Sequence, residues 1–450
     1  MGARKSTDRS GQTTPNAHGS GKNSRRRFLK AAGGLGSAAG LSALAGCIGS
    51  LGSDDETIRI GTLYDNSGEL GFTGEGKDAV TEMFLEEQDY ELLGREVELI
   101  SYDPAGDNTQ YQNLTRRIIQ EDEVDMLFGA LLSSNREAMR PIVNENKQLY
   151  SYNDWYEGGV CDQFTFINTT LSSQQRPMIE FMIDNFGPDY YAIVADYNYG
   201  TISNQYARFY AEEYGGQPVG EEFVPLGVDE FGSTINDIQQ ADPDWILSLT
   251  IGAPQASFFE QAEAAGLDVP YGSMSNIAGT YEHKTFEPPV MTDTYSCFSY
   301  FEEIPTERNQ EFVEKFKSEY PDFDYVFLSI VDAYTALQLY WEAVELAGTV
   351  DQEEVAAAYE SGDISVEAPS GTVAMDPETH HATQDMWLAH VDESHEVQFL
   401  DVDGNPTDEP ISEQVGTSDW FASECQLASE STWDDPITEQ YIPEEGDLTE

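Results

Sequence analysis

The stretch that decides the fold runs from Val124-Asp-Met-Leu-Phe-Gly129 through Ser134–Asn146 to Leu149-Tyr-Ser-Tyr152. Its first and last pieces are short and apolar, as buried strands are, and its middle piece has the apolar spacing of a helix. Strands joined by crossover helices lie parallel in a sheet that is covered on both faces. The stretch therefore predicts one β-α-β unit of an α/β protein.

The same alternation continues from residue 57 to about residue 275. Further strands are expected at Ile58–Tyr64, Val97–Tyr102, Phe164–Asn168, Tyr191–Asp196, Glu222–Pro225, Trp245–Thr250 and Val269–Met274. Helices are expected between them at Gly74–Gln88, Thr109–Glu121, Ser173–Asn185, Ile202–Tyr214, Thr234–Gln240 and Pro254–Ala265, and later at Asn309–Glu319 and Asp332–Ala347. Shorter strands follow at Thr372–Met375, Trp387–Val391 and Val397–Leu400. These strands are more than one doubly wound sheet would hold, and we therefore expect two Rossmann-like lobes.

The charge balance excludes whole classes of function. The chain has 22 Lys and Arg against 83 Asp and Glu, a formal net charge of −61. Nucleic-acid binding needs cations facing phosphate, so no nucleic-acid partner is expected. Hydrophobic residues make up 39% of the chain, too many for a disordered acidic protein. Such an acidic surface is typical of proteins that work in molar salt, because a Debye length of about 3 Å screens the repulsion between the carboxylates. We therefore expect a halophilic, haloarchaeal protein.

The N-terminus carries two targeting patterns. Ser24-Arg-Arg-Arg-Phe-Leu-Lys30 matches a twin-arginine export motif, and Leu44-Ala-Gly-Cys47 matches a lipobox. We therefore expect residues 1–46 to be a twin-arginine lipoprotein signal, Cys47 to carry lipid and residues 47–56 to form a tether. The mature protein would then sit on the extracellular face of the cell membrane, held by its lipid anchor.

The C-terminal part and the cysteines are less informative. Residues 401–450 form an acidic C-terminal tail, and we expect much of it, from Glu409 to Glu450, to be loosely packed. With Cys47 assigned to lipid, the remaining cysteines are Cys161, Cys297 and Cys425. They allow one disulfide and one free thiol, and the sequence leaves the pairing open.

Polar and aromatic residues gather in the loops that follow the predicted strands. Ligands of such sheets bind beyond the carboxyl ends of the strands, and hydroxyls with aromatic faces suit a small polar solute. The candidate ligand-binding residues in these loops are Ser133, Ser134, Tyr152, Asp154, Tyr156, Tyr199, Ala253 and Asn276. Ser134 also begins the capping box Ser134-x-x-Glu137, which alone would explain it.

Asp154 bears most directly on the choice of ligand. A carboxylate accepts hydrogen bonds from amide N–H groups and repels the carboxylate of a ligand. An Asp154 that faces the ligand therefore favours urea or an amide over an amino acid, whereas an Asp154 that faces solvent has no influence.

Other motifs give no catalytic or metal-binding set. The glycine-rich Gly71-Phe-Thr-Gly-Glu-Gly76-Lys77-Asp78 has Asp where a P-loop needs Ser or Thr, so it is expected to lead into the first helix. His380-His381 lacks spaced partner ligands and is expected to be a solvated loop. We expect neither enzymatic activity nor a cofactor.

The order of several motifs resembles a known family. Gly129-Ala-Leu-Leu-Ser133 is followed by Tyr152-Asn-Asp-Trp-Tyr156-Glu-Gly158, by Asp196-Tyr-Asn-Tyr199, by Ser299-Tyr-Phe-Glu-Glu-Ile-Pro305 and by Ala368-Pro-Ser-Gly-Thr-Val373. This series, over about residues 57–400, resembles the urea and short-chain-amide-binding branch of the type I periplasmic binding proteins, relatives of the Leu/Ile/Val-binding proteins.

The resemblance implies an α/β fold of two lobes with parallel sheets, joined by three crossovers. One lobe would comprise residues 57–168 plus 303–365, and the other 169–302 plus 366–400. The family's ligand contacts would fall on Ser133, Tyr152, Asp154, Tyr199 and the loop around Ala253. The chain departs from the amide binders at Leu131, where Tyr is usual, at Asp154, where Thr is common, and at Ala253, which replaces a hydroxyl residue.

The resemblance also implies a function. The protein would be the solute-binding receptor of an ABC transporter that captures urea or a short-chain amide and delivers it to the permease subunits. A receptor for branched-chain or other amino acids stays open as an alternative, as does an amide sensor that regulates a partner protein. A secreted amidase would need a nucleophile and a base that the sequence does not show.

Overall fold

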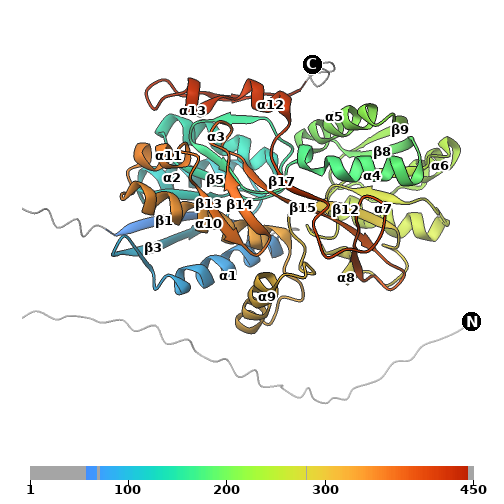
Figure 1. Cartoon of the computed structure of the whole chain (residues 1–450), viewed down its shortest axis with the longest axis horizontal. Helices are drawn as coiled ribbons and strands as arrows, with labels where there is room; N and C mark the ends of the chain where they lie inside the picture. The colour runs from blue at the N-terminus through green and yellow to red at the C-terminus, as the bar shows by residue number, and fades with distance from the viewer. Residues whose placement is uncertain (1–56, 68–70, 280, 444–450) are drawn as a thin grey trace, which may run out of the picture. The chain divides into compact units, whose positions relative to one another are not determined.

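The computed structural model describes residues 57–67, 71–279 and 281–443 (Figure 1). All its helices and strands belong to one compact unit, Asp55–Glu450. Among the described residues, no helix is both long enough and apolar enough to cross a bilayer. The targeting patterns, Cys47 and the predicted tether lie outside the described residues.

The first sheet contains the predicted β-α-β unit, which is formed by β4, α3 and β5. Its strand order is β2-β3-β1-β4-β5-β7, parallel except for β2. The strands are β1 (Ile58–Leu63), β2 (Glu91–Leu92), β3 (Arg95–Tyr102), β4 (Met126–Gly129), β5 (Tyr150–Tyr152) and β7 (Thr165–Ile167). Helices α1 (Gly71–Glu87), α2 (Asn108–Gln120) and α3 (Ser133–Asn146) connect them. Three further helices come later in the chain: α9 (Glu307–Glu319), α10 (Leu328–Ala347) and α11 (Gln352–Tyr359). Helices α10 and α11 pack against the apolar core of the first sheet (Figure 1). We call the first sheet and these helices together the first lobe.

The second sheet is mixed. Its order is β13-β14-β15-β12-β11-β10-β8-β9, with β16 (Val397–Phe399) and β17 (Ser412–Val415) also paired to β15. Strands β8 (Asp189–Ala195), β9 (Gln217–Val224), β10 (Trp245–Leu249), β11 (Tyr271–Ser273) and β12 (Thr294–Phe298) are parallel. Helices α4 (Arg176–Phe186), α5 (Asn198–Glu213), α6 (Gly232–Ala241), α7 (Gly252–Ala265) and the short α8 (Glu282–Thr285) complete this second lobe. The expected α/β fold of two Rossmann-like lobes with parallel sheets is confirmed, and β15 (Ala382–Val391) adds a strand that runs antiparallel to β12.

Between β1 and β16 the chain passes between the lobes three times, and after β17 it returns to the first lobe, where β18 (Thr438–Gln440) pairs with β6 (Val160–Asp162). It leaves β7 through the 3-10 turn η1 (Ser172–Gln175) and leaves β12 toward α9. The third passage is β15, which pairs with β14 at its start and with β12 at its end. The boundary expected at residue 366 falls inside β13 (Ser365–Ala368) and before β14 (Gly371–Met375), yet Val373 and Met375 pack in the first lobe's core.

The C-terminal part is ordered into elements, so the expectation of a loosely packed tail is wrong for the described residues up to 443. After β17 come α12 (Asp419–Glu424), α13 (Leu427–Glu430) and β18 (Thr438–Gln440), and β18 pairs with β6 (Val160–Asp162). A disulfide joins Cys161 to Cys425, and Cys297 is a buried free thiol. The sequence pattern missed this region because its strands are short and polar.

Candidate functional site

The carboxyl ends of β1, β4 and β5 bring a buried ion pair together. The Lys77 ammonium on α1 lies 2.6 Å from the Asp154 carboxylate, and their side chains are 1% and 0% exposed. Lys77 also donates to the carbonyl oxygen of Ala130 at 3.2 Å, and the Ser329 hydroxyl on α10 donates to Asp154 at 3.1 Å. Asp154 is therefore neutralised by a neighbour 77 residues away, and the alternative that it faces solvent is wrong because its side chain is 0% exposed.

A second buried ion pair lies on the next loop. Arg136 on α3 lies 2.7 Å from Glu157, both side chains are 0% exposed, and the Ser133 hydroxyl donates to Glu157 at 2.5 Å. Burial lowers the pKa of Arg136, but the Glu157 and Glu137 carboxylates together with Tyr156 and Tyr152 outweigh burial, so the pKa lies well above its ordinary value. The guanidinium also lies 5.0 Å from the ring centroid of Tyr152 and 4.6 Å from that of Tyr156, a cation–π arrangement.

The three candidate tyrosines bond to the backbone. The Tyr152 hydroxyl lies 2.8 Å from each of two carbonyl oxygens, those of Leu131 and Trp155. Tyr156 accepts a hydrogen bond from the Val160 N–H, and Tyr199 donates to the Met274 carbonyl at 2.7 Å. Because these hydroxyls have protein partners, the tyrosines contribute ring faces to the site and hold its loops in place.

The two lobes touch around this cluster. A Cβ placed on Gly279 would lie only 2.6 Å from Cζ2 of Trp155, so this first-lobe indole packs directly on the second-lobe loop Ser275–Gly279. The Leu328 N–H donates to the Ala278 carbonyl at 2.8 Å. One apolar cluster accordingly contains Trp155 together with the second-lobe residue Tyr199.

Several buried polar atoms at this junction have no hydrogen-bond partner within the part of the chain that the structure describes. They are Nε1 of Trp155, Nδ2 of Asn276 and Oδ1 of Asn153. The three residues are 5%, 0% and 0% exposed. A buried polar group without a partner costs about 1–3 kcal/mol, so the two donors and the acceptor left open here are available to a bound solute or to water.

The remaining candidates lie as follows. Ser134 is half-buried inside the first turn of α3, whose N-cap is Leu132, and the Leu132 N–H donates to Oδ1 of Asn135. The capping box at Ser134 is therefore wrong. Asn276 accepts from the Ser273 hydroxyl through Oδ1. Ala253 lies in α7, and its side chain is outside the described part.

Sequence reasoning missed four residues of this cluster: Lys77, Arg136, Trp155 and Glu157. Lys77 stood in the glycine-rich stretch, which does lead into α1 as expected. Its position directly after Gly74 and Gly76 on a helix was a usable signal, because a Lys that faces the interior needs a carboxylate partner. Arg136 and Glu157 carried no such local signal, since their pairing is set by the fold.

The histidine pair is also placed differently from the expectation. His380 and His381 are 0% and 1% exposed, so the solvated loop is wrong. His380 stacks on Phe166, and His381 stacks on Tyr156 with 5.5 Å between ring centroids. Burial lowers the pKa of His381 to about 3, so this imidazole is neutral in the folded protein.

Two α/β lobes that meet around a buried polar cluster define a two-lobed binding protein. The chain belongs to the periplasmic binding protein family, whose sequence profile matches residues 57–396. A Leu/Ile/Val-binding protein homolog of Brucella abortus is 20% identical over 366 residues, which cover 78% of this chain and 93% of that protein.

Solved structures show the same fold. An ABC-transporter solute-binding protein from R. palustris in complex with benzoate superposes with a TM-score of 0.70 at 20% identity, over 80% of this chain and 98% of its own. A leucine-binding protein from Thermotoga maritima gives a TM-score of 0.68 at 20% identity, over 76% of this chain and 97% of its own. At these identities the similarity establishes the fold.

Proposed function

We propose that the protein is the extracytoplasmic solute-binding receptor of an ABC transporter and that it captures urea or a short-chain amide between its lobes. The observation that carries the ligand class is the set of unpartnered neutral groups, Nε1 of Trp155, Nδ2 of Asn276 and Oδ1 of Asn153. Urea and amides offer a carbonyl acceptor and N–H donors on one small planar frame, which matches two donors and one acceptor.

The charges around these groups support a neutral solute. Lys77 and Arg136 each have a carboxylate within 2.7 Å, so the two buried pairs cancel and leave no net positive charge. A solute carboxylate would have to compete with Asp154 or Glu157 for a cation. Breaking such a buried pair costs about 3–5 kcal/mol, which a small ligand would have to supply from its other contacts.

A receptor for a carboxylate-bearing solute is the second candidate. Relatives in the family are named for leucine or were solved with benzoate. The observation that favours it here is the N-terminus of α3, where Ser133 and Ser134 begin the helix without a side-chain cap from Leu132. Free N–H groups at a helix start attract anions.

We also propose how the protein is exported, anchored and coupled to its transporter. Twin-arginine export, a lipid anchor at Cys47 and life in molar salt rest on the sequence patterns and the charge. Delivery to permease subunits follows from the receptor role. We place the hinge at the passages near Asn168 and Phe301, where the chain changes lobes.

Calorimetric titration in molar KCl tests the proposal. Urea, acetamide, leucine and benzoate are titrated into the purified protein, and each solute is recovered afterwards to check that it is unchanged. Saturable binding of urea or acetamide, with leucine and benzoate silent, is expected. Binding of leucine or benzoate with urea and acetamide silent would replace the proposal by the second candidate, and hydrolysis of the amide would reinstate an amidase.

A further inference from the structure

We propose that residues 412–441, here called the strap, tie the two lobes together and limit how far they separate. The inference rests on the proposed function in one respect, since it assumes that the lobes open to admit a solute. It adds a device that the receptor role does not require.

The strap is fixed firmly to the first lobe. Cys425 is disulfide-bonded to Cys161, and Glu439 of β18 pairs with that same Cys161 in β6. The Trp433 ring packs edge-on against Phe164, with 5.1 Å between centroids. This end of the strap is therefore held to the first lobe by a covalent bond, by strand pairing and by ring packing.

The other end of the strap reaches the second lobe. Strand β17 pairs with β15, and the side-chain amide of Gln174, in the passage η1, donates to the Val415 carbonyl at 2.7 Å. Trp420 packs against the second lobe's apolar core and also against the cluster that contains Cys161 and Cys425. The phenol of Tyr206 on α5 is hydrogen-bonded with Ser418. Burial raises the pKa of Tyr206 to about 12, with the Ser418 bond acting in the opposite direction.

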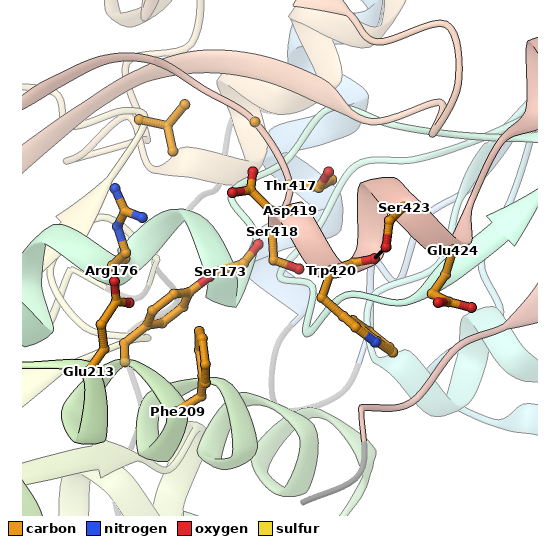
Figure 2. A pocket seen from close by; sticks show the side chains of 13 residues that line it. Ser173, Arg176, Phe209, Glu213, Thr417, Ser418, Asp419, Trp420, Ser423 and Glu424 are labelled. Carbon is orange, nitrogen blue, oxygen red and sulfur yellow. Dashed lines mark hydrogen bonds between the residues drawn. The ribbon is translucent and has the colours of Figure 1, made fainter. Parts of the chain in front are cut away.

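This second-lobe contact is incomplete. A pocket of about 820 Å³ lies between α4 and α5 on one side and residues 415–424 on the other. Figure 2 shows Phe209 on α5 across from Trp420 on the strap, while Glu213 on the same helix points toward Arg176. Beside α5 the strap is therefore packed loosely, although β17 holds its start to β15 by strand pairing, and the part that faces α5 is the part that separates when the lobes move.

Tyr206 connects the strap to the candidate site. A Cβ on Gly158 would lie 3.3 Å from Cε2 of Tyr206, so this ring sits against the loop that carries Glu157. The Glu157 carboxylate also adds to the raised pKa of Tyr206, after burial. Opening the hinge would pull Tyr206 away from this loop and from the strap together.

The strap therefore stabilises the arrangement in which the lobes touch. Contacts made only in one of two conformations shift the population toward it, and a solute that binds that conformation then binds more tightly. Loosening the strap should lengthen the distance between the lobes and weaken solute binding, without altering any residue that contacts the solute.

Spin labels on exposed positions of the two lobes test this in the absence of solute. Gln112→Cys on α2 and Asp237→Cys on α6 are labelled in a Cys47→Ser background, and buried Cys297 is left in place. Two strap tryptophans are compared: Trp420→Ala removes packing on the second lobe together with packing on the cluster of Cys161 and Cys425, whereas Trp433→Ala removes packing on the first lobe only. The double variant Cys161→Ser/Cys425→Ser releases the covalent end.

Distances measured by pulsed electron resonance should gain a longer component in Trp420→Ala and in the cysteine variant, but not in Trp433→Ala. Solute affinity should fall by about 5-fold or more in the same two variants. Identical distance distributions in Trp420→Ala and the parent would overturn the strap, even if the cysteine variant fails to fold. If no solute binds the parent, the proposed function fails while the distances still decide the strap.

Discussion

Replacing Lys77 by Met should destabilise the fold far more than its single side chain suggests. The Lys77 ammonium and the Asp154 carboxylate lie 2.6 Å apart, and their side chains are 1% and 0% exposed. The substitution therefore leaves a carboxylate in the interior whose remaining donors are the Ser329 hydroxyl and the backbone N–H of Trp155. Removing one partner of a buried pair costs about 3–5 kcal/mol. Asp154→Asn alone should cost a similar amount, because it leaves the ammonium unpaired.

The double variant Lys77→Met/Asp154→Asn carries neither charge, and Asn keeps the Oδ1 acceptor for Ser329 and Trp155. Its loss should therefore be smaller than the sum of the single losses by about 2–3 kcal/mol, a coupling typical of contacting groups. Guanidinium-induced unfolding of all four proteins in molar KCl measures the cycle, and it avoids urea, which is a proposed ligand. Additive losses, or a Lys77→Met cost below about 1 kcal/mol as for an exposed pair, would refute the buried neutral pair.

Two further predictions concern acid stability and the contact between the lobes. His381 has a folded pKa of about 3 against an ordinary value of 6.5, so the unfolded chain binds the proton first and stability is lost as pH falls from about 6.5 toward 3. The loss amounts to up to about 5 kcal/mol, and it should be absent in His381→Gln when unfolding is compared at pH 7 and pH 5. An equal loss in both proteins would contradict it. Gly279→Ala should push Trp155 off the second-lobe loop and weaken solute binding about 10-fold or more. Gly232→Ala is the control, because a Cβ at that position would meet open space. Equal affinities of the two variants would show that the contact between Trp155 and the loop has no role in binding.

The strands and helices that carry the fold could be predicted because each has its own local signal. Trp245–Leu249 and Ile58–Leu63 are apolar runs, and their observed bounds lie within a residue of those expected. Strand β12, Thr294-Tyr-Ser-Cys-Phe298, was missed because polar and apolar residues alternate in it without a flanking helix signal. Strands β17 and β18 pair with distant partners, so their short polar sequences could not reveal them.

The candidate site was predictable in place but not in chemistry. The strand-end rule gathers Ser133, Tyr152 and Asp154 at one edge of the first sheet, since parallel strands end together. The sequence could not show that Lys77 would neutralise Asp154, because the two meet only after α1 folds back on the sheet. The ligand preference therefore rests on open hydrogen-bonding groups rather than on a lone carboxylate.

Calorimetric titration of acetamide and urea into the parent protein, Asn276→Ala and Trp155→Phe tests the central claim most directly. Each substitution deletes one unpartnered donor at the junction of the lobes. The account predicts that the parent binds and that each variant loses about 10-fold in affinity, since one hydrogen bond to a neutral partner contributes about 1 kcal/mol or somewhat more. Binding that is unchanged in both variants would contradict it, because the solute would then be held elsewhere.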